Sequence, residues 1–132
     1  MLRLPRSMRI FASTRWTDFR RDVDGLVRVV REDFGKDPCS GDLFCFFNCD
    51  RDRVKLLVWD RNGFWILSKR LERGRFEALG KRAPVIEIGR EELVMILAGI
   101  DTRTSRFRRQ FVRDVRMTPR AAADARSEGV AQ

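Results

Sequence analysis

The sequence predicts an α+β fold: a mostly antiparallel sheet of about four to five strands with two helices packed on one face, plus a basic C-terminal extension. Short apolar runs of strand length alternate with two segments of helical spacing. The connections between the strands are short, which favours antiparallel pairing. Because 132 residues can bury one modest core, we assign residues 1–102 to a single domain and residues 103–132 to a partly helical or disordered extension.

The first elements are a short strand near residues 9–12 and a helix that begins at Asp18. Thr17 is the expected N-cap, and the charge of Asp18 suits a helix N-terminus. The apolar stripe of this helix consists of Phe19, Val23, Leu26, Val27 and Val30. Gly25 lies inside the helix at a cost of about 1 kcal/mol relative to Ala, which a close packing contact would explain.

Three strands are expected next, at residues 43–47, 53–59 and 64–71. The last two are joined by Asp60-Arg61-Asn62-Gly63, which is typical of a hairpin. A two-residue Asn-Gly turn places Lys55 opposite Arg70, whereas a type I turn with Gly63 in the left-handed region places Lys55 opposite Lys69. In both registers two cations face each other at the far end of the hairpin, and opposed like charges destabilise a strand pair.

A fifth strand is predicted at residues 85–88 and a second helix at residues 90–98. Glu91 and Glu92 lie in the first turn of that helix, and Gly99 follows its end. The residues expected to face the core are Leu93, Ile96, Leu97 and Ile100.

The composition narrows the function classes. The chain has no His, which excludes Ser-His-Asp, Cys-His and His-based metal chemistry. Three cysteines without a signal peptide indicate reduced thiols in a cytoplasmic protein. Association with the nucleoid is compatible with that expectation. No apolar run is long enough to span a membrane. We expect no enzyme activity, no cofactor, no metal, no membrane and no small-molecule substrate.

The net charge of +9 indicates an anionic partner. All but four of the 28 basic residues are Arg, whose planar fork suits phosphates and base edges. A genome that encodes Arg in place of Lys would produce the same bias. Three Trp and ten Phe would form either a stacking platform for single-stranded bases or, as is more common, the core.

The densest basic block is Lys69-Arg70-Leu71-Glu72-Arg73-Gly74-Arg75-Phe76. We interpret it, together with Lys55, as a binding site for nucleic-acid phosphate in which Gly74 allows close backbone approach. The residues assigned to this site are Lys55, Lys69, Arg70, Arg73 and Arg75. The alternative is a solvated loop whose cations pair with Glu72, Glu77 and nearby acids.

A second basic segment lies in the C-terminal extension, where Arg is frequent and Phe107, Phe111 and Val115 follow helical spacing. It would be either an arm that orders on a nucleic acid or acidic partner, or an extension without function. The arginines assigned to the site are Arg106, Arg108, Arg109 and Arg113. Asp18 and Asp22 are the best candidates for a catalytic metal, but ion pairing with Arg20 and Arg21 accounts for them more simply.

The order and spacing of several short motifs resemble a known family: the accessory protein TnpB, encoded by the second reading frame of IS-66 type insertion sequences, and not the RNA-guided nuclease of the same name. The resemblance covers about residues 8–101. The matching pieces are Met8-Arg9-Ile10-Phe11, Thr17-Asp18-Phe19-Arg20, Asp24-Gly25-Leu26, Asp37-Pro38, Ser40-Gly41, Leu43-Phe44, Asp52-Arg53-Val54-Lys55, Trp59-Asp60, the block from Lys69 to Phe76, Leu97 and Gly99-Ile100-Asp101.

The resemblance implies a non-catalytic role in DNA transposition beside a separate transposase. Two mechanisms fit that role. In the first, which we favour, the basic residues bind nucleic acid, most simply DNA. In the second, the protein is an adaptor that docks on the transposase or another element-encoded protein without contacting DNA. A metal-dependent nuclease is the least favoured alternative.

Overall fold

A single sheet organises the structure, a computed structural model that describes residues 5, 7–80 and 83–99. The strands are β1 Ile10–Ser13, β2 Leu43–Phe47, β3 Arg53–Asp60, β4 Gly63–Arg70 and β5 Val85–Ile88. Helix α1 spans Val23–Arg28 and continues into a π-helical turn, η1, at Val29–Asp33, and helix α2 spans Arg90–Leu97. The predicted extension, with Arg106, Arg108, Arg109 and Arg113, lies outside the described residues.

The strand order in the sheet is β4-β3-β2-β1-β5. Strands β1 and β2 pair in parallel, because the chain crosses over through α1 between them, and the other three pairings are antiparallel. The predicted mostly antiparallel α+β sheet is therefore confirmed. None of the helices in the described part of the chain is long and apolar enough to cross a bilayer.

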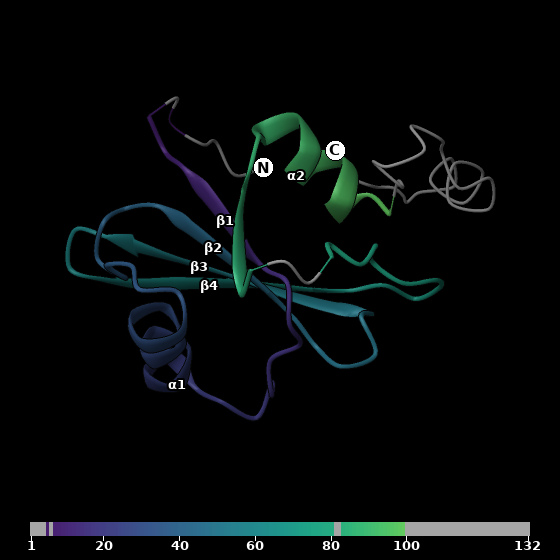
Figure 1. Cartoon of the computed structure of the whole chain (residues 1–132), viewed down its shortest axis with the longest axis horizontal. Coiled ribbons are helices and arrows are strands. Elements are labelled where there is room, and N and C mark those ends of the chain that lie inside the picture. Colours follow the sequence, from purple (N-terminus) through teal and green to yellow (C-terminus); the bar gives the residue numbers. More distant parts are fainter. Residues whose placement is uncertain (1–4, 6, 81–82, 100–132) are drawn as a thin grey trace.

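The two helices cover opposite faces of the sheet, so the expectation that both pack on one face is wrong (Figure 1). The reason lies in β2, whose five consecutive apolar residues are all buried. Leu43, Cys45 and Phe47 belong to the core cluster that contains residues of α2. Phe44 and Phe46 belong to the other cluster, which contains residues of α1 and η1. A strand that is apolar on both sides requires a covering element on each side.

Helix α1 begins later than expected, and Asp22, not Thr17, caps it. The Asp22 carboxylate accepts a hydrogen bond from the Gly25 N–H at 3.0 Å. Thr17 is buried instead and donates its backbone N–H to the Phe47 carbonyl at 2.8 Å, which ties residues 14–22 across the end of β2 as a loop. A Cβ on Gly25 would lie 2.8 Å from the Arg21 Cβ, so the close contact proposed for this glycine is confirmed.

The β3–β4 hairpin adopts neither predicted register. Asp60 pairs with Gly63 across an Arg61-Asn62 turn, in which Arg61 has a φ of +55°, and Lys55 lies opposite Ser68. This register pairs the apolar residues of the two strands with each other: Leu56 with Leu67, Leu57 with Ile66, Val58 with Trp65 and Trp59 with Phe64. The two predicted registers would have placed polar side chains opposite Leu56 or Leu57.

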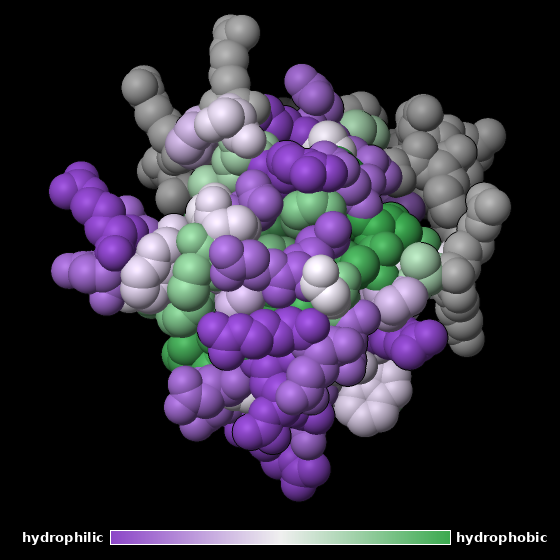
Figure 2. All heavy atoms as spheres, turned by 60° about the vertical axis from the view of Figure 1, so that its left-hand side comes forward, coloured by the Kyte–Doolittle hydropathy of each residue, from purple (hydrophilic) through white to green (hydrophobic). Residues whose placement is uncertain are grey.

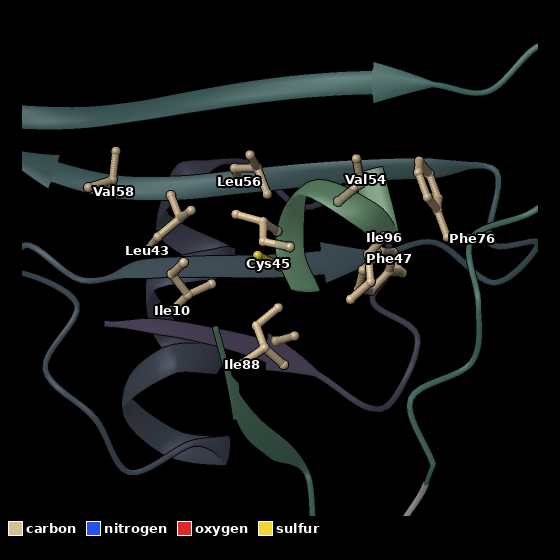
Figure 3. Close-up of a cluster of buried hydrophobic side chains, with 12 residues drawn as sticks. Ile10, Leu43, Cys45, Phe47, Val54, Leu56, Val58, Phe76, Ile88 and Ile96 are labelled. Carbon is tan, nitrogen blue, oxygen red and sulfur yellow. The ribbon is translucent and has the colours of Figure 1, made fainter. Parts of the chain in front are cut away.

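Cys45 lies within the larger core cluster, among the side chains of β1, β2 and β3 that face α2 (Figure 3). Burial raises the pKa of its thiol to about 12. Cys39 and Cys49 are exposed. We therefore expect a thiol reagent at mildly alkaline pH to modify two of the three cysteines in the native protein and all three after denaturation. Cys45→Ala should leave the native count unchanged, and rapid modification of a third native thiol would contradict this packing.

Candidate nucleic-acid interface

The predicted basic block ends in a loop, residues 72–75, that is closed at its base. The Leu71 N–H donates to the Asp52 carbonyl at 2.7 Å, and the Phe76 N–H donates to the Arg51 carbonyl at 2.7 Å. Glu72, Arg73, Gly74 and Arg75 between these two anchors are exposed. Gly74 has a φ of +75°, a conformation that favours glycine. The fold therefore presents the Arg73-Gly74-Arg75 tip from a fixed base.

That base is the turn of residues 48–52, which joins β2 to β3. The Asn48 side chain donates to the Asp52 carboxylate at 2.7 Å and accepts from the Asp52 and Arg53 N–H groups at 3.1 and 2.9 Å. Asn can bond its own backbone in this way, and the resulting turn places the carbonyls of Arg51 and Asp52 toward the loop. The turn and the loop are thus one hydrogen-bonded unit.

Arg51 joins the turn to the segment that follows the loop through its side chain. It occupies the left-handed region with a φ of +58°, and its guanidinium lies 4.8 Å from the centre of the Phe47 ring. Nε donates to the Phe76 carbonyl at 3.0 Å, and the other donor of the fork bonds the Glu77 carbonyl. Partial burial lowers the pKa of Arg51, and the charge of Glu77 opposes that shift. No local sequence pattern marks Arg51, because its role depends on Phe76, 25 positions away.

The five cations predicted to form one site lie at the same end of the sheet but not on one face. Lys55 is on the α1 face, where its Nζ donates to the Phe19 carbonyl at 3.2 Å and lies 4.8 Å from the centre of the Phe19 ring. Lys69 is on the α2 face, and its Nζ donates to the Leu97 carbonyl at the end of α2 at 2.8 Å. That bond supplies a donor to one of the last carbonyls of the helix, which have no partner within the helix itself. Lys55 and Lys69 therefore have structural partners.

Arg70 is exposed on the α1 face and lies directly opposite Arg53 in the β3–β4 pair. The prediction that two cations face each other at the far end of the hairpin is correct, but the partner is Arg53 and not Lys55. Arg70 also forms an ion pair with Glu72 at 3.2 Å, with side chains 58% and 78% exposed. A pair this open to solvent is worth little. Arg53, Arg70, Arg73 and Arg75 thus form the exposed basic surface at this end, which we call the basic rim.

The loop of residues 14–22 adds a second polar surface beside Lys55. Asp18 accepts a side-chain hydrogen bond from Arg20 at 2.8 Å, and this contact lowers the pKa of Asp18 to about 2. Asp22 is occupied as the helix cap. Ion pairing and capping therefore account for both acids. Among the described residues, no group of three or more potential metal ligands is present.

Two aromatic side chains in the described part of the chain are exposed, Trp16 and Trp65. Trp16 is 61% exposed and borders a hollow of about 200 Å³ with Arg15, Arg21, Asp33 and Phe34. Trp65 is 60% exposed on β4, and its Nε1 donates to Asp60 at 3.1 Å. The Phe residues of the described chain are buried or half-buried, as the core interpretation predicts. Among residues 7–80 and 83–99, no continuous aromatic platform is present at the basic rim.

The comparisons with known proteins agree on one relationship. The family model described as IS66 Orf2 like protein matches residues 8–107. The uncharacterized protein y4jC of Sinorhizobium fredii is 35% identical over 102 residues, which are 76% of this chain and 87% of the relative. The uncharacterized protein y4hO of the same organism is 32% identical over 103 residues, 78% of this chain and 90% of that relative. No solved structure matches the chain significantly.

Proposed function

Because the chain belongs to the IS66 Orf2-like family of insertion-sequence accessory proteins, we propose that it assists transposition without catalysis, by binding DNA phosphates at the basic rim. The observation that carries the proposal is the anchored loop. Residues 71 and 76 are fixed by two 2.7 Å backbone bonds, and the tip between them carries Arg73 and Arg75 into solvent. A pre-ordered basic loop loses little conformational entropy when it meets a phosphate.

The charge arrangement in the strands supports the same function. Arg53 and Arg70 face each other in an exposed antiparallel pair, although opposed like charges destabilise such a pair by up to about 1 kcal/mol. A polyanion that contacts both would reverse the sign of this contribution. Lys55 and Lys69 are proposed to add charge from behind the rim while they keep their carbonyl partners.

The test is DNA binding as a function of salt. We expect Arg73→Ala/Arg75→Ala to weaken binding to a duplex from the element's end by on the order of tenfold or more, and to reduce the slope of log K against log salt by about 2. Fluorescence anisotropy with a labelled duplex measures both. The matched control is Arg28→Ala/Arg31→Ala, which removes the same charge from exposed positions on α1 and η1. Its slope should change far less.

The outcomes separate the two mechanisms. Equal losses in both double variants would show that net charge, and not the basic rim, attracts DNA. Absence of any complex at low salt would reject DNA binding. If the wild-type protein then co-purified with the transposase after nuclease treatment, and the Arg73→Ala/Arg75→Ala variant did not, the adaptor mechanism would replace it, with acidic residues of the transposase as the partner of the same rim.

A further inference from the structure

Strand β4 forms one edge of the sheet and offers a full row of backbone groups. It pairs with β3 over eight consecutive residues without a bulge. The bond from the Leu71 N–H to the Asp52 carbonyl continues this ladder, so the odd-numbered residues of β4 are those that bond β3. Phe64, Ile66, Ser68 and Arg70 therefore direct their N–H and C=O groups away from the sheet. Within the described residues, no backbone bond to these groups is present.

The first half of this edge lacks the usual protection against pairing, whereas Lys69 and Arg70 charge its far end. Natural edge strands are shortened, bulged, charged along their length or interrupted by proline. β4 has eight residues, contains no proline, and carries the apolar run Phe64-Trp65-Ile66-Leu67 in its first half. Trp65 is 60% exposed. The face of the molecule in Figure 2 is mostly hydrophilic, with smaller apolar areas between the hydrophilic side chains.

We propose that β4 pairs antiparallel with β4 of a second copy of this chain, so that the two sheets become one continuous sheet across a two-fold axis near Ile66. A second copy fits because the apolar run of each strand, residues 64–67, then lies opposite residues 65–68 of the other copy. An antiparallel arrangement also places Lys69 and Arg70 of one copy beside the Gly63 end of the other. The two Arg70 residues are then about 25–30 Å apart. A parallel arrangement would set them directly side by side, where they repel.

The two-fold axis of such a pairing runs perpendicular to the sheet, so both α1 helices and both Arg53–Arg70 pairs lie on the same side. The spacing of about 25–30 Å between the two Arg70 positions approaches one turn of B-DNA, about 34 Å. The dimer does not depend on the proposed function. Only this last consequence, that the dimer presents two basic rims to one duplex, rests on it.

The dimer is tested by sedimentation of the full chain, treated with nuclease, over a range of concentrations. We expect the mass to approach twice 15.5 kDa. Ser68→Pro removes one outward N–H from an exposed edge position and should raise the dissociation constant at least about tenfold. Ser68→Thr keeps that N–H and should dimerise like the wild type. Because two chains of net charge +9 repel, added salt should strengthen the dimer, whereas it weakens binding to DNA.

Residue-resolved hydrogen exchange on the wild-type protein provides a test that survives any folding defect of the proline variant. The amides of Phe64, Ile66 and Ser68 should exchange about tenfold more slowly well above the dissociation constant than well below it. The amides of Trp65 and Leu67, which bond β3, should change less. A monomeric mass at every concentration would overturn the proposal. So would protection of the outward amides that is independent of concentration, because the edge would then be covered by the same chain.

Discussion

Truncation of Phe76 to alanine is expected to lower the free energy of unfolding by about 3–5 kcal/mol. Phe76 is 2% exposed, and its ring centre lies 5.6 Å from that of Phe47 in the cluster beneath α2. Figure 3 shows the two rings at the same end of this cluster, near Ile96. The side chain is the apolar anchor of the segment that follows the basic loop, so its removal leaves a cavity and also releases the loop from the core.

Chemical denaturation followed by circular dichroism measures the stability loss. Phe76→Leu fills much of the same space and should cost roughly half as much, while Arg75→Ala on the exposed neighbouring position should change stability by about 0.5 kcal/mol or less. Trypsin should also cleave the Phe76→Ala variant faster after Arg73 and Arg75 under native conditions, because the loop opens more often. A loss below about 1 kcal/mol would show that Phe76 does not anchor the loop.

The elements that could be predicted well are those whose pattern is local. The bounds of β2 and β5 match the prediction, because a continuous apolar run and a short β-branched run each end in polar or turn residues. The start of α1 could not be predicted from the Thr17-Asp18 signal. Thr17 is held by the Phe47 carbonyl, a contact between residues far apart in the sequence. That contact outweighs the local capping preference and moves the helix start to Val23.

The register of the hairpin and the faces on which the basic residues lie are both encoded in local sequence patterns. Matching Leu56 and Leu57 to apolar partners would have selected the observed register. Alternation along a strand would have placed Lys69 and Arg70 on opposite faces, and it would have grouped Arg53 with Lys55. The continuous burial of β2 would likewise have required a helix on each face. No local pattern predicts the Arg51 clamp, by which we mean the bonds from its guanidinium to the Phe76 and Glu77 carbonyls. These contacts exist only in the tertiary structure.

Arg51→Ala is expected to lower the free energy of unfolding by about 3 kcal/mol. Hydrogen bonds from a charged group are worth roughly 1.5–3 kcal/mol each, and the two that Arg51 donates fall toward the lower value because its guanidinium is only partly buried. The substitution removes the bonds to the Phe76 and Glu77 carbonyls and the contact with the Phe47 ring. It also removes a positive charge that acts on Glu77, which is 6% exposed. DNA binding should fall as well, since the Arg73-Gly74-Arg75 tip then loses part of its fixed base.

Backbone strain can be separated from the clamp by glycine variants at the two left-handed arginines, Arg51 and Arg61, whose φ values are +58° and +55°. Release of that strain is worth about 1 kcal/mol. Arg61 is exposed in the β3–β4 turn, so Arg61→Gly should stabilise the protein by up to that amount. Arg51→Gly should remain destabilising, by about 1 kcal/mol less than Arg51→Ala. If both glycine variants were equally stabilising in denaturant titrations, Arg51 would be a strained turn residue and no clamp, and the basic loop would have no fixed base.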